Sequence, residues 1–204
     1  MITLNSDAAS TSLSKTTKAI LNEYGIKLNK NLGQNYLIDR NKRDQIIQFG
    51  NLTKDDVVLE IGPGIGTLTI ELAKRVKKVI AIEQDSNICQ ILENRLKKEN
   101  IDNVELINDD ALNVEFPKFD KIISNLPYQI SSPITFKFLN YEFQLAILMY
   151  QKEFASRMNG KVGSKDYSRL SAMLYFKCDV DWYAWEKLSN QSGKFTFINK
   201  KLMG

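Results

Sequence analysis

Residues 57–67 read Val57-Val58-Leu59-Glu60-Ile61-Gly62-Pro63-Gly64-Ile65-Gly66-Thr67. A short, mostly apolar run enters a turn with three glycines, and Leu68, Leu72 and Val76 follow at helical spacing. This order predicts a strand, a tight loop and a helix, the opening unit of a nucleotide-type α/β fold. Glycines let a backbone approach a ligand closely, and that ligand lies beyond the carboxyl end of the strand. An ordinary strand–helix turn remains the alternative interpretation of this stretch on its own.

The same alternation continues downstream and defines the fold class. Further apolar runs predict strands at Val79–Ile82, Val104–Ile107, Lys121–Ser124 and Leu145–Met149, and helical spacing predicts helices at Ser86–Lys98 and from Pro133 to about Asn140. Alternating strands and helices indicate a doubly wound, mainly parallel sheet that helices cover on both faces. The 204 residues suit one such domain.

The two ends of the chain differ from this pattern. Residues 1–14 are rich in Ser, Thr and Ala and are expected to form a flexible lead-in. A helix is expected over Lys15–Tyr24, then an extended polar loop, and then a helix over Arg40–Phe49 that Asp39 caps. Residues 193–204 form an atypical tail in which Phe195 and Phe197 alternate with polar residues. This alternation predicts one additional strand at the edge of the sheet.

Composition excludes several classes of function. The chain contains no histidine, which rules out Ser-His-Asp, Cys-His and histidine–metal mechanisms. Cys89 and Cys178 lie far apart, a spacing that fits a reducing compartment and argues against a zinc site. No secretion signal or membrane-spanning run is recognisable, so we expect a cytoplasmic location without a membrane. The net charge of +4 permits a polyanionic partner without requiring one.

Two acidic positions follow the second and third predicted strands. Glu83 lies about 20 residues after the glycine loop, where nucleotide-binding folds place a carboxylate that accepts hydrogen bonds from ribose hydroxyls. Asp109 and Asp110 end the third strand on the same edge, where a carboxylate can accept from an adenine amino group. A solvated carboxylate is the alternative for Glu83, and a helix cap is the alternative for the aspartates.

The fourth strand leads into Asn125-Leu126-Pro127-Tyr128, the most specific signal in the sequence. An amide, a backbone carbonyl and an aromatic ring on a proline-fixed turn suit a planar base that carries an exocyclic amine. The Asn125 side-chain oxygen and the Leu126 carbonyl would accept from that amine, while Tyr128 stacks on the ring. Two fixed acceptors would aim the nitrogen lone pair at an electrophilic methyl group without a strong general base.

Five segments in order resemble the ribosomal RNA adenine N6,N6-dimethyltransferases, the KsgA-like family, and its archaeal branch most closely. The segments are residues 31–39 (NLGQNYLID), 60–69 (EIGPGIGTLT), 125–133 (NLPYQISSP), 148–158 (LMYQKEFASRM) and 166–171 (DYSRLS). The resemblance runs from about Lys15 to Ser192, so residues 15–192 are expected to form the methyltransferase catalytic domain. It implies a Rossmann-like methyltransferase fold that is truncated at its C-terminal end.

The resemblance further implies S-adenosylmethionine as cofactor and dimethylation of N6 in two adjacent adenosines near the 3′ end of small-subunit ribosomal RNA. Carried over motif by motif, it assigns Asn35 and Leu37 to closure over the cofactor and Gly62 and Gly64 to its amino-acid part. Glu83 would bind the ribose hydroxyls and Asp110 the adenine amine. Asn125 would face both the methyl donor and the target base, with Leu126, Pro127 and Tyr128 completing the catalytic set.

The expected partner is the small ribosomal subunit, and the protein is expected to be a monomer. Two groups of lysines and arginines are candidates for contact with the RNA. One candidate group is Lys152, Arg157, Lys161, Lys165 and Arg169, and a weaker one is Lys74, Arg75, Lys77 and Lys78. Such groups neutralise phosphates but carry no sequence information. Ordinary solvated faces are the alternative for both.

The family pattern ends at about residue 192, and the family's C-terminal helical domain is expected to be absent. This departure favours a rival function, a ribosome-assembly or RNA-binding factor with little turnover. A second rival is an Erm-type methyltransferase of large-subunit RNA. The archaeal-like segments count against the second rival. Pro63 and the Asn125–Tyr128 motif have no role in hydride transfer, which argues against a nicotinamide oxidoreductase.

Overall fold

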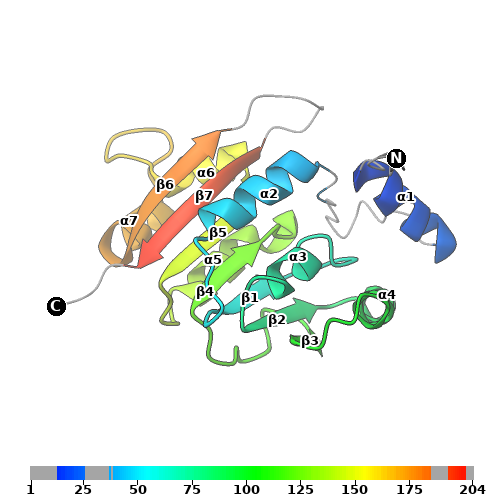
Figure 1. The fold of residues 1–204 in the computed structure, drawn as a ribbon. Helices are drawn as coiled ribbons and strands as arrows, with labels where there is room; N and C mark the ends of the chain where they lie inside the picture. The colour runs from blue at the N-terminus through cyan, green and yellow to red at the C-terminus, as the bar shows by residue number, and fades with distance from the viewer. Residues whose placement is uncertain (1–12, 26–36, 38, 185–192, 201–204) are drawn as a thin grey trace, which may run out of the picture.

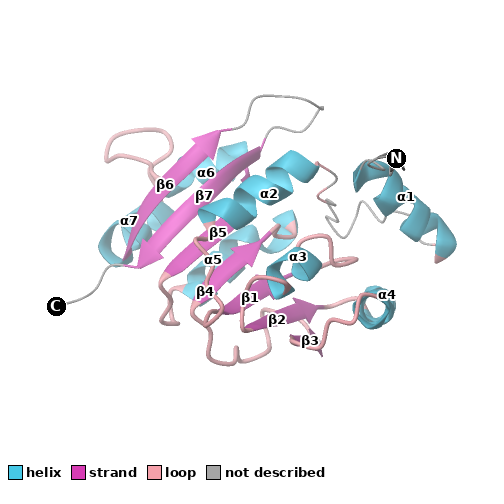
Figure 2. Ribbon diagram, viewed as in Figure 1, coloured by secondary structure: helices cyan, strands magenta, loops and turns pink. Residues whose placement is uncertain are grey.

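A computed structural model describes residues 13–25, 37, 39–184 and 193–200, and shows a seven-stranded sheet covered by helices (Figures 1 and 2). The strand order is β3-β2-β1-β4-β5-β7-β6. The strands are β1 Val57–Ile61, β2 Lys78–Glu83, β3 Val104–Asn108, β4 Lys121–Ser124, β5 Leu145–Gln151, β6 Cys178–Ala184 and β7 Gly193–Lys200. The helices are α1 Leu13–Glu23, α2 Arg40–Phe49, α3 Thr69–Ala73, α4 Ser86–Lys98, α5 Ser131–Phe138, α6 Lys152–Met158 and α7 Arg169–Lys177, with a 3-10 turn η2 at Tyr128–Ile130.

The five strands β3, β2, β1, β4 and β5 are parallel, which confirms the predicted doubly wound α/β fold. The central strands are buried on both faces and mostly apolar, because helices lie on both sides of the sheet. Helices α2 and α3 pack on one face, and α5, α6 and α7 pack on the other (Figure 2). All five parallel strands therefore end at one edge, where ligands bind in open sheets of this kind.

The structure confirms the predicted helices, with shifts at some of their ends. Asp39 and Asp85 cap α2 and α4, each accepting two backbone N–H bonds of the first turn through its side chain. Helix α1 begins at Leu13, two residues earlier than expected. The helix after the glycine loop is shorter than expected, because α3 ends at Ala73 rather than continuing through Val76. Helix α5 begins at Ser131 and has Pro133 in its first turn, where a missing N–H costs nothing.

The last strand corrects a prediction. Residues 193–200 do form a strand, but β7 lies between β5 and β6 and is antiparallel to both, so it is not the edge strand. The edge position belongs to β6, which the sequence analysis did not identify. An interior place satisfies the backbone groups on both sides of β7, whereas an edge strand leaves one row unpaired.

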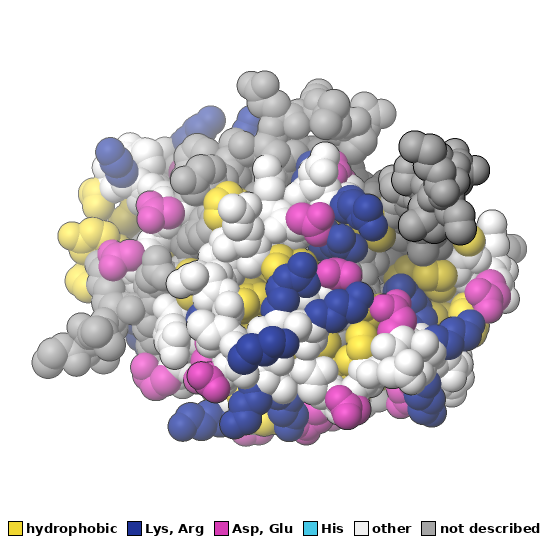
Figure 3. Space-filling model, in the orientation of Figure 1, with side chains coloured by type: hydrophobic (Ala, Val, Ile, Leu, Met, Phe, Trp, Pro, Cys, Tyr) yellow, Lys and Arg dark blue, Asp and Glu magenta, His cyan; other side chains and the backbone are white. Residues whose placement is uncertain are grey.

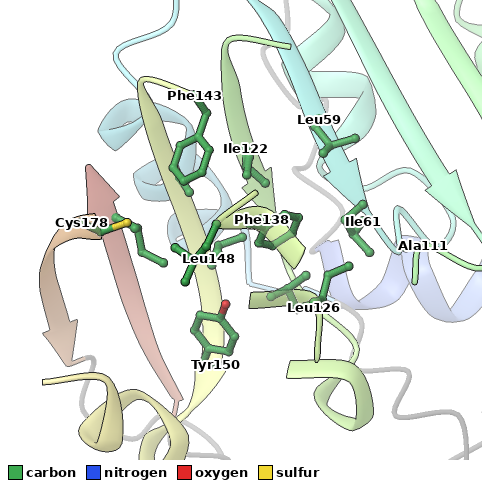
Figure 4. Close-up of a cluster of buried hydrophobic side chains, with 14 of the residues drawn as sticks. Leu59, Ile61, Ala111, Ile122, Leu126, Phe138, Phe143, Leu148, Tyr150 and Cys178 are labelled. Carbon is green, nitrogen blue, oxygen red and sulfur yellow. The ribbon is translucent and has the colours of Figure 1, made fainter. Parts of the chain in front are cut away.

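The hydrophobic core lies mainly between the sheet and helices α5 to α7 (Figure 4). Phe138 and Tyr150 are its largest fully buried side chains. The Tyr150 hydroxyl lies 2.6 Å from Thr135 Oγ1, which donates to the Ser131 carbonyl at 2.6 Å. These bonds join β5 to the first turn of α5 and so fix the segment that follows Asn125.

A buried ion pair lies at the opposite edge of the sheet, where the parallel strands begin. Lys121 Nζ is 2.9 Å from Asp56 Oδ2 and also donates to the Asn51 carbonyl at 2.7 Å. Burial raises the pKa of the Asp56 carboxyl, but the Thr53 backbone N–H and Lys121 outweigh this and hold that pKa below its usual value. In the described part of the chain, no helix is long and apolar enough to cross a bilayer.

Candidate functional site

A cavity of about 520 Å³ opens at the carboxyl ends of β1, β2, β3 and β4. Its walls come from the ends of these four strands, the connections after them and the segment before α2, so residues far apart in the sequence meet there. It is lined by Leu37, Glu60, Ile61, Gly62, Pro63, Gly64, Thr67, Leu68, Ile82, Glu83, Gln84, Asp85, Asp109, Asp110, Ala111, Asn125, Pro127, Gln129 and Ile130. Ligand-binding pockets of proteins commonly have volumes of roughly 300–1,000 Å³, and this cavity falls in that range.

The glycine loop after β1 forms one wall of the cavity. Gly62 and Gly64 have φ values of +67° and +56°, a region that side-chain-bearing residues rarely adopt. A Cβ atom on Gly62 would lie 2.9 Å from Pro127 Cγ, so the loop and the turn after β4 touch only because this residue is glycine. The backbone N–H of Gly62 donates to the Ile82 carbonyl at 2.9 Å, which holds the loop against β2.

Glu83 ends β2 beside this loop, as the sequence predicts. Its carboxylate accepts from the backbone N–H of Gly64 at 3.2 Å and of Asp85 at 3.0 Å. Burial raises the pKa of Glu83, and these two N–H bonds lower it in part. Two donors fix the carboxylate and leave acceptor capacity on its oxygens for a ligand.

Asp109 and Asp110 follow β3 and both line the cavity. Asp110 Oδ1 accepts from the Leu112 backbone N–H at 2.9 Å and so stabilises a turn; no helix begins there, and the alternative of a helix cap does not apply to Asp110. The Asp109 backbone N–H donates to the Glu83 carbonyl at 3.1 Å. The backbone of Asp109 is therefore held against the end of β2, and both aspartates lie on the edge where the sequence places them.

The four residues of the Asn125–Tyr128 motif point in different directions. The side chains of Asn125 and Pro127 line the cavity. Leu126 is 1% exposed and its side chain is part of the core shown in Figure 4, so only its backbone can serve a ligand. Tyr128 is half-buried in η2 and does not line the cavity, and burial raises the pKa of its hydroxyl. Gln129 and Ile130, which the sequence analysis did not select, do line it.

The segment before α2 contributes Leu37, which is buried and lines the cavity. Asn35, its predicted companion, lies outside the described residues. The structure thus brings together Leu37, Gly62, Gly64, Glu83, Asp110, Asn125 and Pro127.

Glu60 is a site residue that sequence reasoning missed. It lies in the interior of β1, is 2% exposed and lines the cavity. Its Oε2 atom makes no hydrogen bond to any described residue, and neither does the buried Thr69 Oγ1. Burial raises the pKa of Glu60 to about 8, with a smaller rise from the charge of Glu83 and a partial lowering by the nearby Thr69 hydroxyl. A glutamate inside an otherwise apolar strand was the available signal.

The charge of the cavity has one sign. Glu60, Glu83, Asp85, Asp109 and Asp110 line it, and no lysine or arginine is among its lining residues within the described ranges. These carboxylates do not form a metal site: no group of three or more acidic or cysteine side chains in the described chain is arranged to hold an ion. The cavity therefore favours a ligand with positive charge.

The predicted RNA-binding cations surround the loop between α6 and α7. Lys152, Arg157, Lys161, Lys165 and Arg169 are all exposed. Lys152 follows the carboxyl end of β5, so the group begins on the same edge of the sheet as the cavity. The guanidinium of Arg169 lies 5.4 Å from the centre of the Phe136 ring, a cation–π contact that holds it on α5.

The weaker candidate group is partly neutralised. Lys and Arg side chains also gather over α2 and α3 (Figure 3). There, Lys74 and Arg75 form ion pairs with Glu71 at 3.1 and 2.9 Å. Lys78 pairs with Glu105 at 2.5 Å. These pairs favour the α6–α7 group as the RNA contact.

A family model described as ribosomal RNA adenine dimethylase matches residues 25–184. The chain belongs to the ribosomal RNA adenine dimethylase family. A relative from Methanosphaera stadtmanae, named probable ribosomal RNA small subunit methyltransferase A, is 56% identical over 164 residues. That match covers 80% of this chain and 60% of the relative. A protein of the same name from Methanothermobacter thermautotrophicus is 54% identical, with 81% of this chain and 59% of the relative covered.

Two solved structures extend the dimethylase comparison to the fold. A dimethyladenosine transferase from Plasmodium falciparum has a TM-score of 0.73 and 36% identity, over 80% of this chain and 62% of that one. The 23S rRNA methyltransferase ErmE has a TM-score of 0.69 and 29% identity, over 83% of this chain and 73% of that one. The chain thus has the fold of these methyltransferases and spans about 60% of the length of its curated dimethylase relatives.

Proposed function

We propose that this chain transfers methyl groups from S-adenosylmethionine to N6 of two adjacent adenosines near the 3′ end of small-subunit ribosomal RNA. The observation that carries the proposal is the position of Asn125 in the wall of the same cavity that Gly62 and Glu83 line. An amide beside a nucleotide-type pocket suits a base amine next to a methyl donor. The names of the archaeal relatives and of the Plasmodium falciparum enzyme support the choice of ribosomal adenosine.

The cavity residues fit S-adenosylmethionine. Glu83, held by two backbone N–H groups, is placed to accept from ribose hydroxyls, and Asp110 or Asp109 from the adenine amine. Gly62 and Gly64 line the cavity next to the buried Oε2 of Glu60, where the amino-acid part would lie. The acidic lining suits the positive charge of the cofactor. When bound, the cofactor supplies an electrophilic methyl group on a sulfonium.

The turn after β4 would hold the adenine amine. The Asn125 side-chain oxygen and the Leu126 carbonyl accept from its two N–H groups and draw the nitrogen toward a tetrahedral geometry. The Leu126 side chain is anchored in the core, which keeps its carbonyl in place. Because positioning replaces a strong base, the absence of histidine is no obstacle.

Tyr128 would stack on the target base from outside the cofactor cavity. Its place in η2, directly after Pro127, puts its ring next to the turn and leaves the cavity for the cofactor. The cations around the α6–α7 loop would bind the RNA backbone on the same edge of the sheet. Tyr128 would thus bind the target base, the α6–α7 cations the RNA backbone, and the cavity the cofactor.

The proposal is tested by supplying labelled S-adenosylmethionine with small or large ribosomal subunits that lack the modification. We expect label in the small subunit only. Label in the large subunit would favour an Erm-type activity, which the similarity to ErmE makes the second candidate. Cofactor binding without label in either subunit would favour an assembly factor with little turnover.

A further inference from the structure

A second, smaller cavity lies next to the cofactor cavity and is lined by arginines. This arginine-lined cavity has a volume of about 170 Å³, and its walls come from α1, the start of α2, the end of the glycine loop, α3 and α4. Thr67 lines both cavities, so the glycine loop contributes to both. A molecule of liquid water occupies about 30 Å³, so the arginine-lined cavity has room for a small polyatomic group.

Three guanidinium groups meet at the arginine-lined cavity. Arg40 and Arg43 come from the first turn of α2, and Arg95 comes from α4. Arg40 is exposed and forms no ion pair with the described residues, so its charge is not compensated there. Arg43 donates to Asp44 Oδ1 through Nε at 2.9 Å and through one terminal nitrogen at 2.7 Å. The cavity thus combines cations from two helices that are far apart in the sequence.

Arg95 is largely buried, and its charge is only partly compensated. Its side chain is 18% exposed, donates to the Ile65 carbonyl and lies 3.7 Å from Glu99 Oε1. A guanidinium has five N–H donors, so these contacts leave further donors without a partner among the described residues. Burial lowers the pKa of Arg95, while Glu99 and Tyr24 raise it in part. Burying a cation costs free energy, and an anion bound beside Arg95 would offset that cost.

Two glutamates also line the arginine-lined cavity, and neighbouring cations neutralise both. Glu71 pairs with Lys74 at 3.1 Å and with Arg75 at 2.9 Å, and Glu99 lies 3.4 Å from Lys74 Nζ. Burial raises the pKa of Glu71, but these bonds and the charges of Lys74 and Arg43 outweigh it and hold that pKa below its usual value. Lys74 and Arg75 do not line the cavity and belong to the cations over α2 and α3 (Figure 3). The glutamates are therefore neutralised largely from outside, and the positive charge of the arginines remains.

We propose that the arginine-lined cavity is a phosphate-binding subsite in which Arg40, Arg43 and Arg95 hold one phosphate group. The planar guanidinium presents its N–H donors in a fork that matches two oxygens of a phosphate. The buried Thr17 and the half-buried Thr67 add side-chain hydroxyls to the lining. The inference goes beyond the proposed function, because none of the residues assigned to the cofactor or the target base lines this cavity.

Two sources supply a group of this chemistry. One is a phosphodiester of an RNA strand, which would add a contact to those of the α6–α7 cations. The other is free inorganic phosphate, which would occupy the subsite without RNA. Because α1, α2 and α4 all line the arginine-lined cavity, a phosphate from either source would join the first helix to the rest of the domain.

The test is NMR spectroscopy of the arginine Nε–H groups of the whole chain during titration with inorganic phosphate at constant ionic strength. We expect saturable shifts of the Arg40, Arg43 and Arg95 signals with one shared dissociation constant. Arg40→Gln should fold, because Arg40 is exposed, and should weaken phosphate binding at least about tenfold through the loss of one charged contact. Lys97→Gln, which changes an exposed lysine of α4 outside the arginine-lined cavity, is the matched control and should bind phosphate as the parent does.

Filter binding of small-subunit RNA over a salt series separates the two sources. If the slope of log affinity against log salt falls by about 0.7–0.9 in Arg40→Gln, the subsite holds an RNA phosphate; an unchanged slope assigns it to free phosphate. Arginine shifts that never saturate, shifts confined to one arginine, or unweakened phosphate binding by Arg40→Gln would overturn the inference. A smaller slope without saturable phosphate binding would also overturn it, because Arg40 would then act only as an exposed charge. None of these results depends on methyl transfer.

Discussion

Gly62 and Pro127 are in contact across the cavity wall, so closely that a Cβ on Gly62 would lie 2.9 Å from Pro127 Cγ and 3.0 Å from Pro127 Cδ. The contact joins the two motifs of the site, the glycine loop after β1 and the turn after β4. The proline ring is rigid and cannot move aside as a long side chain can. The distance between the two walls of the cavity is therefore set by the absence of one side chain.

Gly62→Ala should separate these two walls. The variant combines strain at a φ of +67° with a clash against Pro127, so we expect at least a tenfold loss of S-adenosylmethionine affinity. Gly163→Ala is a matched control, because Gly163 has a φ of +84° but nothing within 4 Å of its added Cβ. That control should lose about 1 kcal/mol of stability and keep its affinity. Equal affinities in calorimetry of both variants would contradict the role of the contact.

The ion pair of Lys121 and Asp56 should support stability and leave the chemistry untouched, because it lies at the edge of the sheet opposite the cavity. Lys121→Met leaves a buried carboxylate without its cation, and we expect a loss of about 3 kcal/mol in the free energy of unfolding. The exposed Lys118→Met should change it by less than about 0.5 kcal/mol. Denaturant unfolding measures both, and methyl transfer per folded molecule should be equal. If the two variants unfold at the same denaturant concentration, the ion pair does not contribute to stability.

Glu60 should make stability fall with rising pH. Its carboxyl titrates near 4.5 in the unfolded chain and near 8 in the folded one, so the folded state binds more protons between these values. The free energy of unfolding should thus decrease by up to about 1.4 kcal/mol per pH unit across this window. Glu60→Gln should remove this decrease and unfold at a higher temperature than the parent at pH 8. An unchanged pH dependence in the variant would mean that Glu60 is ionised in the folded protein.

The cations of the α6–α7 loop should determine how salt affects RNA binding. Replacing both Lys161 and Lys165 by Gln should weaken binding of small-subunit RNA and reduce the slope of log affinity against log salt by up to about 2, roughly 0.7–0.9 for each phosphate that is no longer neutralised. Lys97→Gln, a change of an exposed lysine on α4, is the control and should keep the slope. Filter binding over a salt series measures all three proteins. An unaltered slope in the double variant would show that Lys161 and Lys165 do not contact the RNA.

Local pattern was sufficient for most of the elements. The apolar runs of β1, β2 and β4 and the Asp85 cap of α4 are properties of neighbouring residues, and the structure has them where the sequence predicts them. The predicted edge position of β7 was wrong, because the local sequence does not show which distant strands will pair. Loop direction was likewise hidden: the sequence does not reveal that Leu126 faces the core or that Tyr128 lies outside the cavity.

Glu60 shows a further limit of sequence reasoning. Its neighbours in β1 are apolar, and a single acidic residue there looks like part of the strand. Only the enclosed geometry reveals that its oxygen has no partner among the described residues. The predicted partner of Leu37, Asn35, lies outside those residues and stays a prediction.

The most direct test of the account is the identity of the methylated nucleoside. Small subunits that lack the modification are incubated with S-adenosylmethionine and this chain, and their RNA is digested and analysed by mass spectrometry. The account predicts N6,N6-dimethyladenosine from the parent protein and none from Asn125→Ala, which should keep its fold because Asn125 lines the cavity at the end of β4. Equal dimethylation by Asn125→Ala, or no methylated adenosine from a parent chain that binds the cofactor, would contradict it.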